Sequence, residues 1–115
     1  DYTVLPPCEN IRPRYLAMLG MSVDNGHVAL HEPGIPPEFR FGDVNVHAST
    51  ARHLGIEPGT LGRTYGIGML MDAKAILLIL LGPKKWKRFE QALAGDMSLP
   101  VTALLQHPDL TVLTD

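Results

Sequence analysis

The fold is decided by the stretch Tyr15-Leu-Ala-Met-Leu-Gly-Met-Ser-Val-Asp-Asn-Gly-His-Val-Ala-Leu-His-Glu-Pro-Gly34, an apolar run that passes into a polar turn between glycines. The run over residues 15–21 is nearly continuous, which predicts a central parallel strand buried on both faces. A strand that ends in a glycine and a polar loop delivers that loop to the carboxyl edge of the sheet. Ligands bind at this edge in open α/β sheets, so we expect the functional site in residues 20–34.

Ionisable and amide side chains crowd this turn. Asp24, Asn25, His27, His31 and Glu32 lie within nine positions, and an imidazole next to carboxylates suits general acid and base catalysis near neutral pH. The simpler alternative is a loop whose polar groups only satisfy their own backbone.

A zinc site is a further alternative for the same turn. His27 and His31 are four positions apart, and on a helix they would share a face beside Glu32. Gly26 and Pro33 leave little room for such a helix, and no third ligand is evident, so we expect no metal.

The rest of the chain alternates strand and helix patterns. Residues Ala75–Leu81 form an apolar run far shorter than the roughly 20 residues of a membrane span, so they predict a second buried strand. Lys84–Ala94 repeats apolar residues at helical spacing behind Pro83. The shorter expected elements are an edge strand over Val44–Ala48, a helical turn over Thr50–Leu54, a strand or turn over Thr64–Gly68, a brief helix over Met69–Lys74, a short helix over Pro100–Gln106 and a last strand over Leu110–Leu113. This order predicts an α/β fold with a mostly parallel sheet.

Length and charge narrow the class of protein. The 115 residues, 45% of them apolar, predict one domain over residues 1–115, and a net charge of -2 offers no basic face for nucleic acid. The single cysteine, Cys8, rules out an intramolecular disulfide framework and suits a reducing compartment. We therefore expect a cytoplasmic protein without nucleic-acid or membrane partners. The chain opens at Asp1 rather than Met, which indicates either a processed or trimmed N-terminus or a missing upstream half of the domain.

Several motifs in order resemble one enzyme family. They are Asn25-Gly-His-Val-Ala-Leu-His-Glu-Pro33, Thr64-Tyr-Gly-Ile-Gly-Met-Leu-Met-Asp-Ala73, Gly82-Pro-Lys-Lys85 after a strand, and Pro100 to His107-Pro108 before the last strand. Together they resemble the glucosamine-6-phosphate and galactosamine-6-phosphate deaminase/isomerase family, which shares its superfamily with 6-phosphogluconolactonase. The resemblance implies a Rossmann-like three-layer α/β fold of which this chain supplies the C-terminal half.

The resemblance also implies an activity, namely conversion of a hexosamine 6-phosphate to a ketose 6-phosphate plus ammonia, with no metal or organic cofactor. His27 would pass the proton that opens the sugar ring, Glu32 would orient it, and Asn25 stands where many members have aspartate. Lys85 would bind the phosphate, and Arg52 is a candidate for a second contact. For both cations a solvated or salt-bridging side chain is the alternative.

The departures from the family pattern leave alternatives open. Ser22 replaces a usual glycine, His31 replaces a usual asparagine, and the turn is one residue longer, so Asp24 is a candidate for the acid that Asn25 lacks. A non-catalytic sugar-phosphate sensor and a 6-phosphogluconolactonase-like hydrolase are the rival functions, although Glu32-Pro33 speaks against the lactonase. The expected partners are a small sugar phosphate and the missing N-terminal half, and association into a homo-oligomer stays open.

Overall fold

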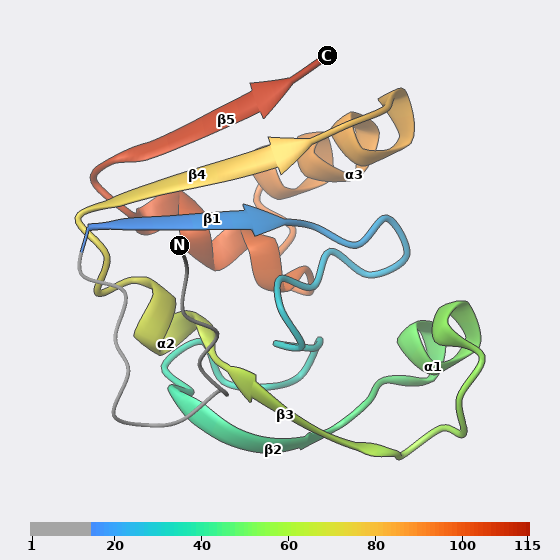
Figure 1. Ribbon diagram of the computed structural model, residues 1–115. Coiled ribbons are helices and arrows are strands. Elements are labelled where there is room, and N and C mark those ends of the chain that lie inside the picture. Colours follow the sequence, from blue (N-terminus) through green and yellow to red (C-terminus); the bar gives the residue numbers. More distant parts are fainter. Residues whose placement is uncertain (1–14) are drawn as a thin grey trace, which may run out of the picture.

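A parallel three-stranded sheet forms the centre of the computed structural model, which describes residues 15–115. The strands are β1 (Leu16–Gly20), β4 (Ala75–Leu80) and β5 (Leu110–Thr114), in the order β1-β4-β5 (Figure 1). β4 lies in the middle and pairs in parallel with both neighbours. The predicted parallel sheet is confirmed, whereas the irregular segment expected for residues 1–13 and Cys8 lie outside the described residues.

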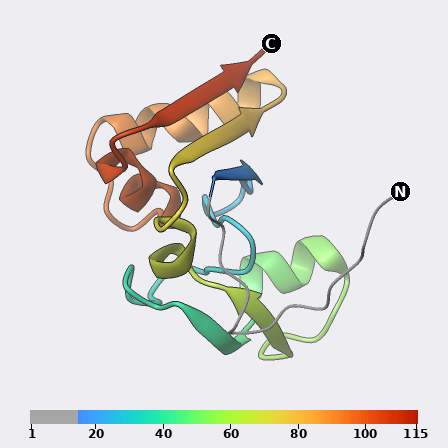
Figure 2. The ribbon, with the colours of Figure 1, turned by 60° about the vertical axis from the view of Figure 1, so that its left-hand side comes forward.

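Helices cover one face of this sheet. α3 (Pro83–Leu93) and the 3-10 helix η1 (Pro100–Gln106) lie together on that face, as Figures 1 and 2 show from two directions. Pro83 occupies the first turn of α3, where its missing N–H would have no helical partner in any case. Phe89 and Ala92 of α3 are buried against Ile76, Leu78 and Leu80 of β4 in the main apolar core. Both helices were predicted to within one residue.

The opposite face of the sheet is exposed. Leu16 is 51% exposed, Met18 61% and Leu113 53%, while Ala17 between them is buried. The prediction that residues 15–21 are buried on both faces is therefore wrong, because burial alternates along β1. Within residues 15–115, helices are seen on one face of the sheet only.

A smaller antiparallel pair lies beside the main sheet. β2 (Phe41–Asn45) pairs with β3 (Leu61–Tyr65), and α1 (Ala48–Leu54) joins them (Figure 1). The edge strand expected over Val44–Ala48 is thus displaced: the observed strand begins at Phe41 and ends at Asn45, before α1 begins. α2 (Ile67–Leu70) then leads back to β4; it overlaps the expected helix over Met69–Lys74 only at Met69 and Leu70.

The crossing between these parts depends on Gly66. Its N–H donates to the Arg40 carbonyl at 2.7 Å, and a Cβ at this position would overlap the carbonyl oxygen of Phe39. Gly66 and Gly68 thus let two backbone segments approach directly. None of the helices within residues 15–115 combines the length and the apolar character that crossing a membrane requires.

Candidate active site

The turn that follows β1 and the start of α3 after β4 meet at one edge of the sheet, because β1 and β4 are parallel. The turn is closed by its own backbone: the Ser22 N–H donates to the His27 carbonyl at 2.9 Å, and the Gly26 N–H donates to the Ser22 carbonyl at 3.0 Å. Gly26 has a φ of 70°, and a Cβ there would come within 3.1 Å of the Leu99 Cβ. Only glycine fits between Asn25 and His27 without strain.

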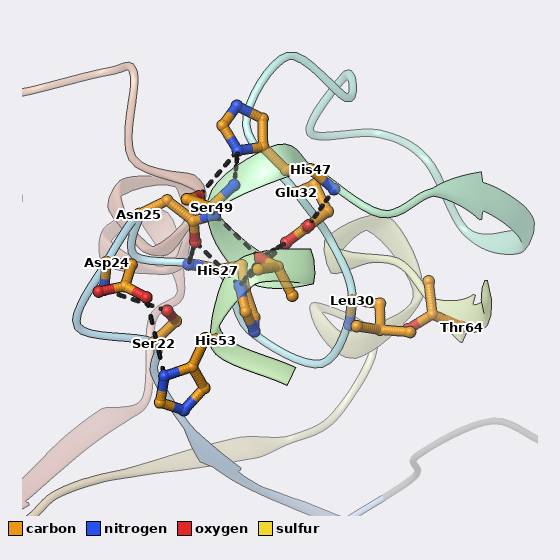
Figure 3. Close-up of polar contacts among 11 residues, drawn as sticks. Ser22, Asp24, Asn25, His27, Leu30, Glu32, His47, Ser49, His53 and Thr64 are labelled. Atoms are coloured by element: carbon orange, nitrogen blue, oxygen red, sulfur yellow. Dashed lines mark hydrogen bonds and ion pairs between the residues drawn. The ribbon is translucent and has the colours of Figure 1, made fainter. Parts of the chain in front are cut away.

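His27 and Glu32 form the centre of the site (Figure 3). The His27 Nδ1 lies 2.9 Å from Glu32 Oε1 and 2.9 Å from Asn25 Oδ1. Glu32 is 1% exposed, and its carboxylate also accepts the His47 backbone N–H at 2.6 Å and the Thr50 hydroxyl at 3.0 Å. A buried carboxylate with three donors is held in one orientation.

These partners assign the proton on the His27 ring. Two oxygens that carry no hydrogen, Glu32 Oε1 and Asn25 Oδ1, face Nδ1, so Nδ1 must donate. The neutral ring then has a bare Nε2, which is the nitrogen that can accept a proton from a ligand.

The surroundings keep His27 neutral at pH 7. Burial lowers the pKa of His27 below its ordinary value, and this effect exceeds the opposing attraction of Glu32 and Asp24; nearby His53 lowers the pKa further. The contact with Glu32 is therefore a hydrogen bond from a neutral imidazole to a carboxylate, ready to stabilise an imidazolium when one forms.

A cavity of about 410 Å³ opens beside His27. Its lining comes from the turn, from α1 and from the start of α3: Gly20, Met21, Ser22, Val23, Asp24, His27, Ala29, Leu30, Thr50, His53, Leu54 and Lys85. Ala29 has a φ of 52°, a strained value for a residue other than glycine, which is common at functional sites. The structure thus brings Lys85 into the same cavity as His27.

Arg52 lies next to this cavity rather than in it. It lines a neighbouring hollow of about 390 Å³ together with Asp24, Ser49 and His53. Asp24 and His53 border both spaces, so the two hollows adjoin. The Asp24 carboxylate lies 3.9 Å from His53 Nδ1, whereas the acid that contacts His27 is Glu32.

His31 takes part in the fold rather than in the cavity. Its ring is 1% exposed, Nδ1 accepts the Ile67 N–H at 3.0 Å, and Nε2 donates to the Ile35 carbonyl at 3.2 Å. Both nitrogens are occupied, so His27 and His31 cannot chelate a metal as a pair. Within residues 15–115 no three His, Cys, Asp or Glu side chains are grouped so that they could hold a metal ion.

α1 contributes residues that were not predicted from the sequence. Ser49 Oγ and Thr50 Oγ1 accept hydrogen bonds from Asn25 Nδ2 at 2.8 and 3.0 Å, and the His47 ring caps the helix by accepting the Ser49 N–H. Their sequence signal is the polar start of a helix, which is typical of capping and does not by itself indicate a site.

Comparisons with known proteins show which proteins this chain is similar to. No family model matches the chain. Over 111 residues it is 37% identical to a protein named glucosamine-6-phosphate deaminase from Bacillus cytotoxicus, and over 112 residues 35% identical to one from Bacillus cereus; each alignment covers 90% of this chain and 42% of the relative. The chain therefore spans less than half the length of these relatives.

Solved structures show the same relationship. A monomeric glucosamine-6-phosphate deaminase is 30% identical with a TM-score of 0.73, over 87% of this chain and 44% of that one. A 6-phosphogluconolactonase from Shewanella baltica is 22% identical with a TM-score of 0.66, over 90% and 45%, and shows the shared fold alone. The chain is thus a homologue of the glucosamine-6-phosphate deaminases, with their Rossmann-like α/β fold over the part that it spans.

Proposed function

We propose that this chain carries the ring-opening part of the active site of an amino-sugar phosphate deaminase/isomerase, which converts a hexosamine 6-phosphate to a ketose 6-phosphate and ammonia. The observation that supports it best is the Glu32–His27 pair, 2.9 Å apart, at the wall of a cavity that Lys85 also lines. An oriented histidine and a cation in one cavity are what a phosphorylated cyclic sugar needs for binding and ring opening.

His27 would act as base and then as acid. Its bare Nε2 takes the proton of the hydroxyl on the anomeric carbon, the bond between that carbon and the ring oxygen breaks, and the imidazolium returns the proton to the ring oxygen. Glu32 stabilises the imidazolium between the two transfers, and Asn25 accepts from the same Nδ1–H. The open aldehyde form is the one that can isomerise.

Lys85 would bind the phosphate. It lies in the first turn of α3, where free backbone N–H groups and the helix dipole favour an anion. Arg52, in the adjoining hollow, is the second candidate. No cofactor is needed for either role.

The exposed face of the sheet would be covered by further polypeptide that completes the site and the domain. Met18, Ile79 and Leu81 form a shallow hollow of about 340 Å³ on this face, and Gly20 and Lys85 border both it and the His27 cavity. The relatives, more than twice as long, have enough chain for such a layer. A reducing cytoplasm suits a chain with one cysteine.

Ammonia release tests the proposal. The full-length protein should release ammonia from glucosamine 6-phosphate or galactosamine 6-phosphate. His27→Ala should lower kcat at least about 100-fold, because the proton transfer is lost. Lys85→Ala should raise KM about 10- to 100-fold, because a charge-assisted contact is lost.

Lys87→Ala is the matched control for Lys85, since Lys87 is exposed on the same helix outside the cavity lining. No ammonia from either sugar, or an unchanged kcat in His27→Ala, would overturn the proposal. Tight binding of the sugar phosphates without turnover would instead identify a sensor.

A further inference from the structure

Two hydroxyls on α1 face the Asn25 side chain. Asn25 Nδ2 lies 2.8 Å from Ser49 Oγ and 3.0 Å from Thr50 Oγ1, while Asn25 Oδ1 faces the Nδ1 and the backbone N–H of His27. Asn25 is 7% exposed and Thr50 2%, so neither side chain can rely on bulk water for its hydrogen bonds. The orientation of a buried amide, with its oxygen on one side and its NH2 group on the other, depends on which neighbouring groups can donate and which can accept hydrogen bonds.

Neither hydroxyl has a hydrogen left to give to Asn25. The Thr50 hydroxyl donates to Glu32 Oε1 at 3.0 Å, and its oxygen, which also lies 3.1 Å from the donating His27 Nδ1, can only accept from that nitrogen. The Ser49 N–H donates to His47 Nδ1, which is therefore an acceptor, so the Ser49 hydroxyl, 2.8 Å from the same nitrogen, also donates to it. Both hydroxyl oxygens can then only accept, and the Asn25 amide must turn its NH2 group toward them.

We propose that Ser49 and Thr50 are positioning residues, which hold the Asn25 amide with its oxygen toward His27 and so keep the His27 proton on Nδ1. If the amide turned over, its NH2 group would face Nδ1 and oppose the proton that Glu32 Oε1 favours there, so part of the protein would carry the proton on Nε2 instead. Only the first arrangement leaves Nε2 able to accept a proton in the cavity. The catalytic meaning of this arrangement rests on the proposed function, whereas the arrangement itself does not.

The arrangement also specifies an uncharged residue at position 25. A carboxylate there would face two hydroxyls whose hydrogens are used elsewhere, and it would stand beside the buried Glu32. Ser49 and Thr50 therefore match asparagine, and the turn and α1 form one hydrogen-bonded unit.

The nitrogen-15 shifts of the His27 ring test this inference in the full-length protein. Above the pH at which His27 titrates, the unaltered protein should show a protonated Nδ1 and a bare Nε2. The Ser49→Ala/Thr50→Val double variant should show a mixture of both forms, and Thr50→Ser should retain the original pattern. Thr111→Val, on the exposed side of β5, is the matched control and should change nothing.

Amide spectra establish that each variant is folded, and the single Ser49→Ala and Thr50→Val changes serve if the double variant is not. A proton on Nε2 in the unaltered protein, or the same pattern in the folded double variant, would overturn the inference. With the sugar phosphate as substrate, we expect kcat of the double variant to fall about 10-fold or more with little change in KM. A tautomer change in a protein that releases no ammonia would refute the proposed function and leave the inference standing.

Discussion

Asn25 and aspartate have nearly the same shape but not the same hydrogens. Asn25→Asp should lower the free energy of unfolding by about 1–3 kcal/mol, because the new carboxylate lacks donors from Ser49 and Thr50. It should also raise the pKa of His27, whose ring already faces Glu32, Asp24 and His53. Since the base must be neutral, the acid side of the activity profile would move to higher pH. Denaturant unfolding and a titration of the His27 ring measure the two effects.

Asn45→Asp makes the same chemical change at an exposed position that ends β2, and it should leave both measurements unaltered. A gain in kcat at pH 7 with unchanged stability in Asn25→Asp would show that the site accepts a carboxylate.

The residues of the turn could be predicted together because they are neighbours in the sequence. Asn25, His27 and Glu32 lie within eight positions, and one glycine turn is enough to bring them into contact. Ser49 and Thr50 lie 24 and 25 positions after Asn25, and only tertiary packing of α1 places them there. Hydroxyl residues at the start of a helix give the same sequence pattern whether they only cap the helix or also contact a functional site.

At the scale of elements, the backbone crossing at Gly66 should be the least tolerant point. Gly66→Ala should lower the free energy of unfolding by more than about 2 kcal/mol, because the new methyl group meets the Phe39 carbonyl and the backbone must move. Thermal or denaturant unfolding measures the loss.

Gly20→Ala is the matched control, since a Cβ at Gly20 meets nothing within 4 Å, and its effect should stay within about 0.5 kcal/mol. Equal losses in the two variants would contradict the close approach at Gly66.

Helices and strands with a clear hydrophobic pattern were predicted well. Strands whose formation depends on pairing with each other were not. α3 and β4 follow from an amphipathic repeat and an apolar run, which are local properties. β2 begins at Phe41, directly after a segment with Pro36 and Pro37, and β3 contains Gly62; both signals favoured loops. The two strands form because they pair with each other, which a single sequence does not display.

At the scale of the whole molecule, acid should destabilise the protein through its buried histidines. Burial lowers the pKa of both His27 and His31 in the folded state, so the unfolded chain binds more protons once the pH falls to about 6.5. The free energy of unfolding should then decrease as the pH falls, by up to about 1.4 kcal/mol per pH unit for each histidine, until the folded-state pKa is passed. Unfolding at a series of pH values measures this slope.

His31→Asn should separate the two contributions. The asparagine can still accept the Ile67 N–H but loses the bond to the Ile35 carbonyl and the edge contact with Phe39, so stability at pH 8 should fall by about 1–3 kcal/mol. The acid slope should become shallower at the same time. His53→Asn, with a side chain 76% exposed, should leave the stability at pH 8 unchanged. An unchanged slope in His31→Asn would contradict the assignment.

The burial of the sheet could not be predicted from the apolar runs alone. An apolar run predicts burial of both faces of a strand. It does not identify the segment of polypeptide that would cover each face. In residues 15–115 the second face of β1 carries Leu16 and Met18 in the open.

Arg88 of α3 donates to the carbonyl oxygens of Val23 and Asp24 at 2.7 and 3.1 Å, one helical turn after Lys85. These hydrogen bonds hold α3, which carries Lys85, in a fixed position relative to the turn that carries His27. Under the proposed function, the fixed separation of His27 and Lys85 would select substrates by the distance between the ring oxygen and the phosphate. In a sugar with the phosphate on another carbon, either the phosphate could contact Lys85 or the ring oxygen could contact His27. The two contacts could not form at the same time.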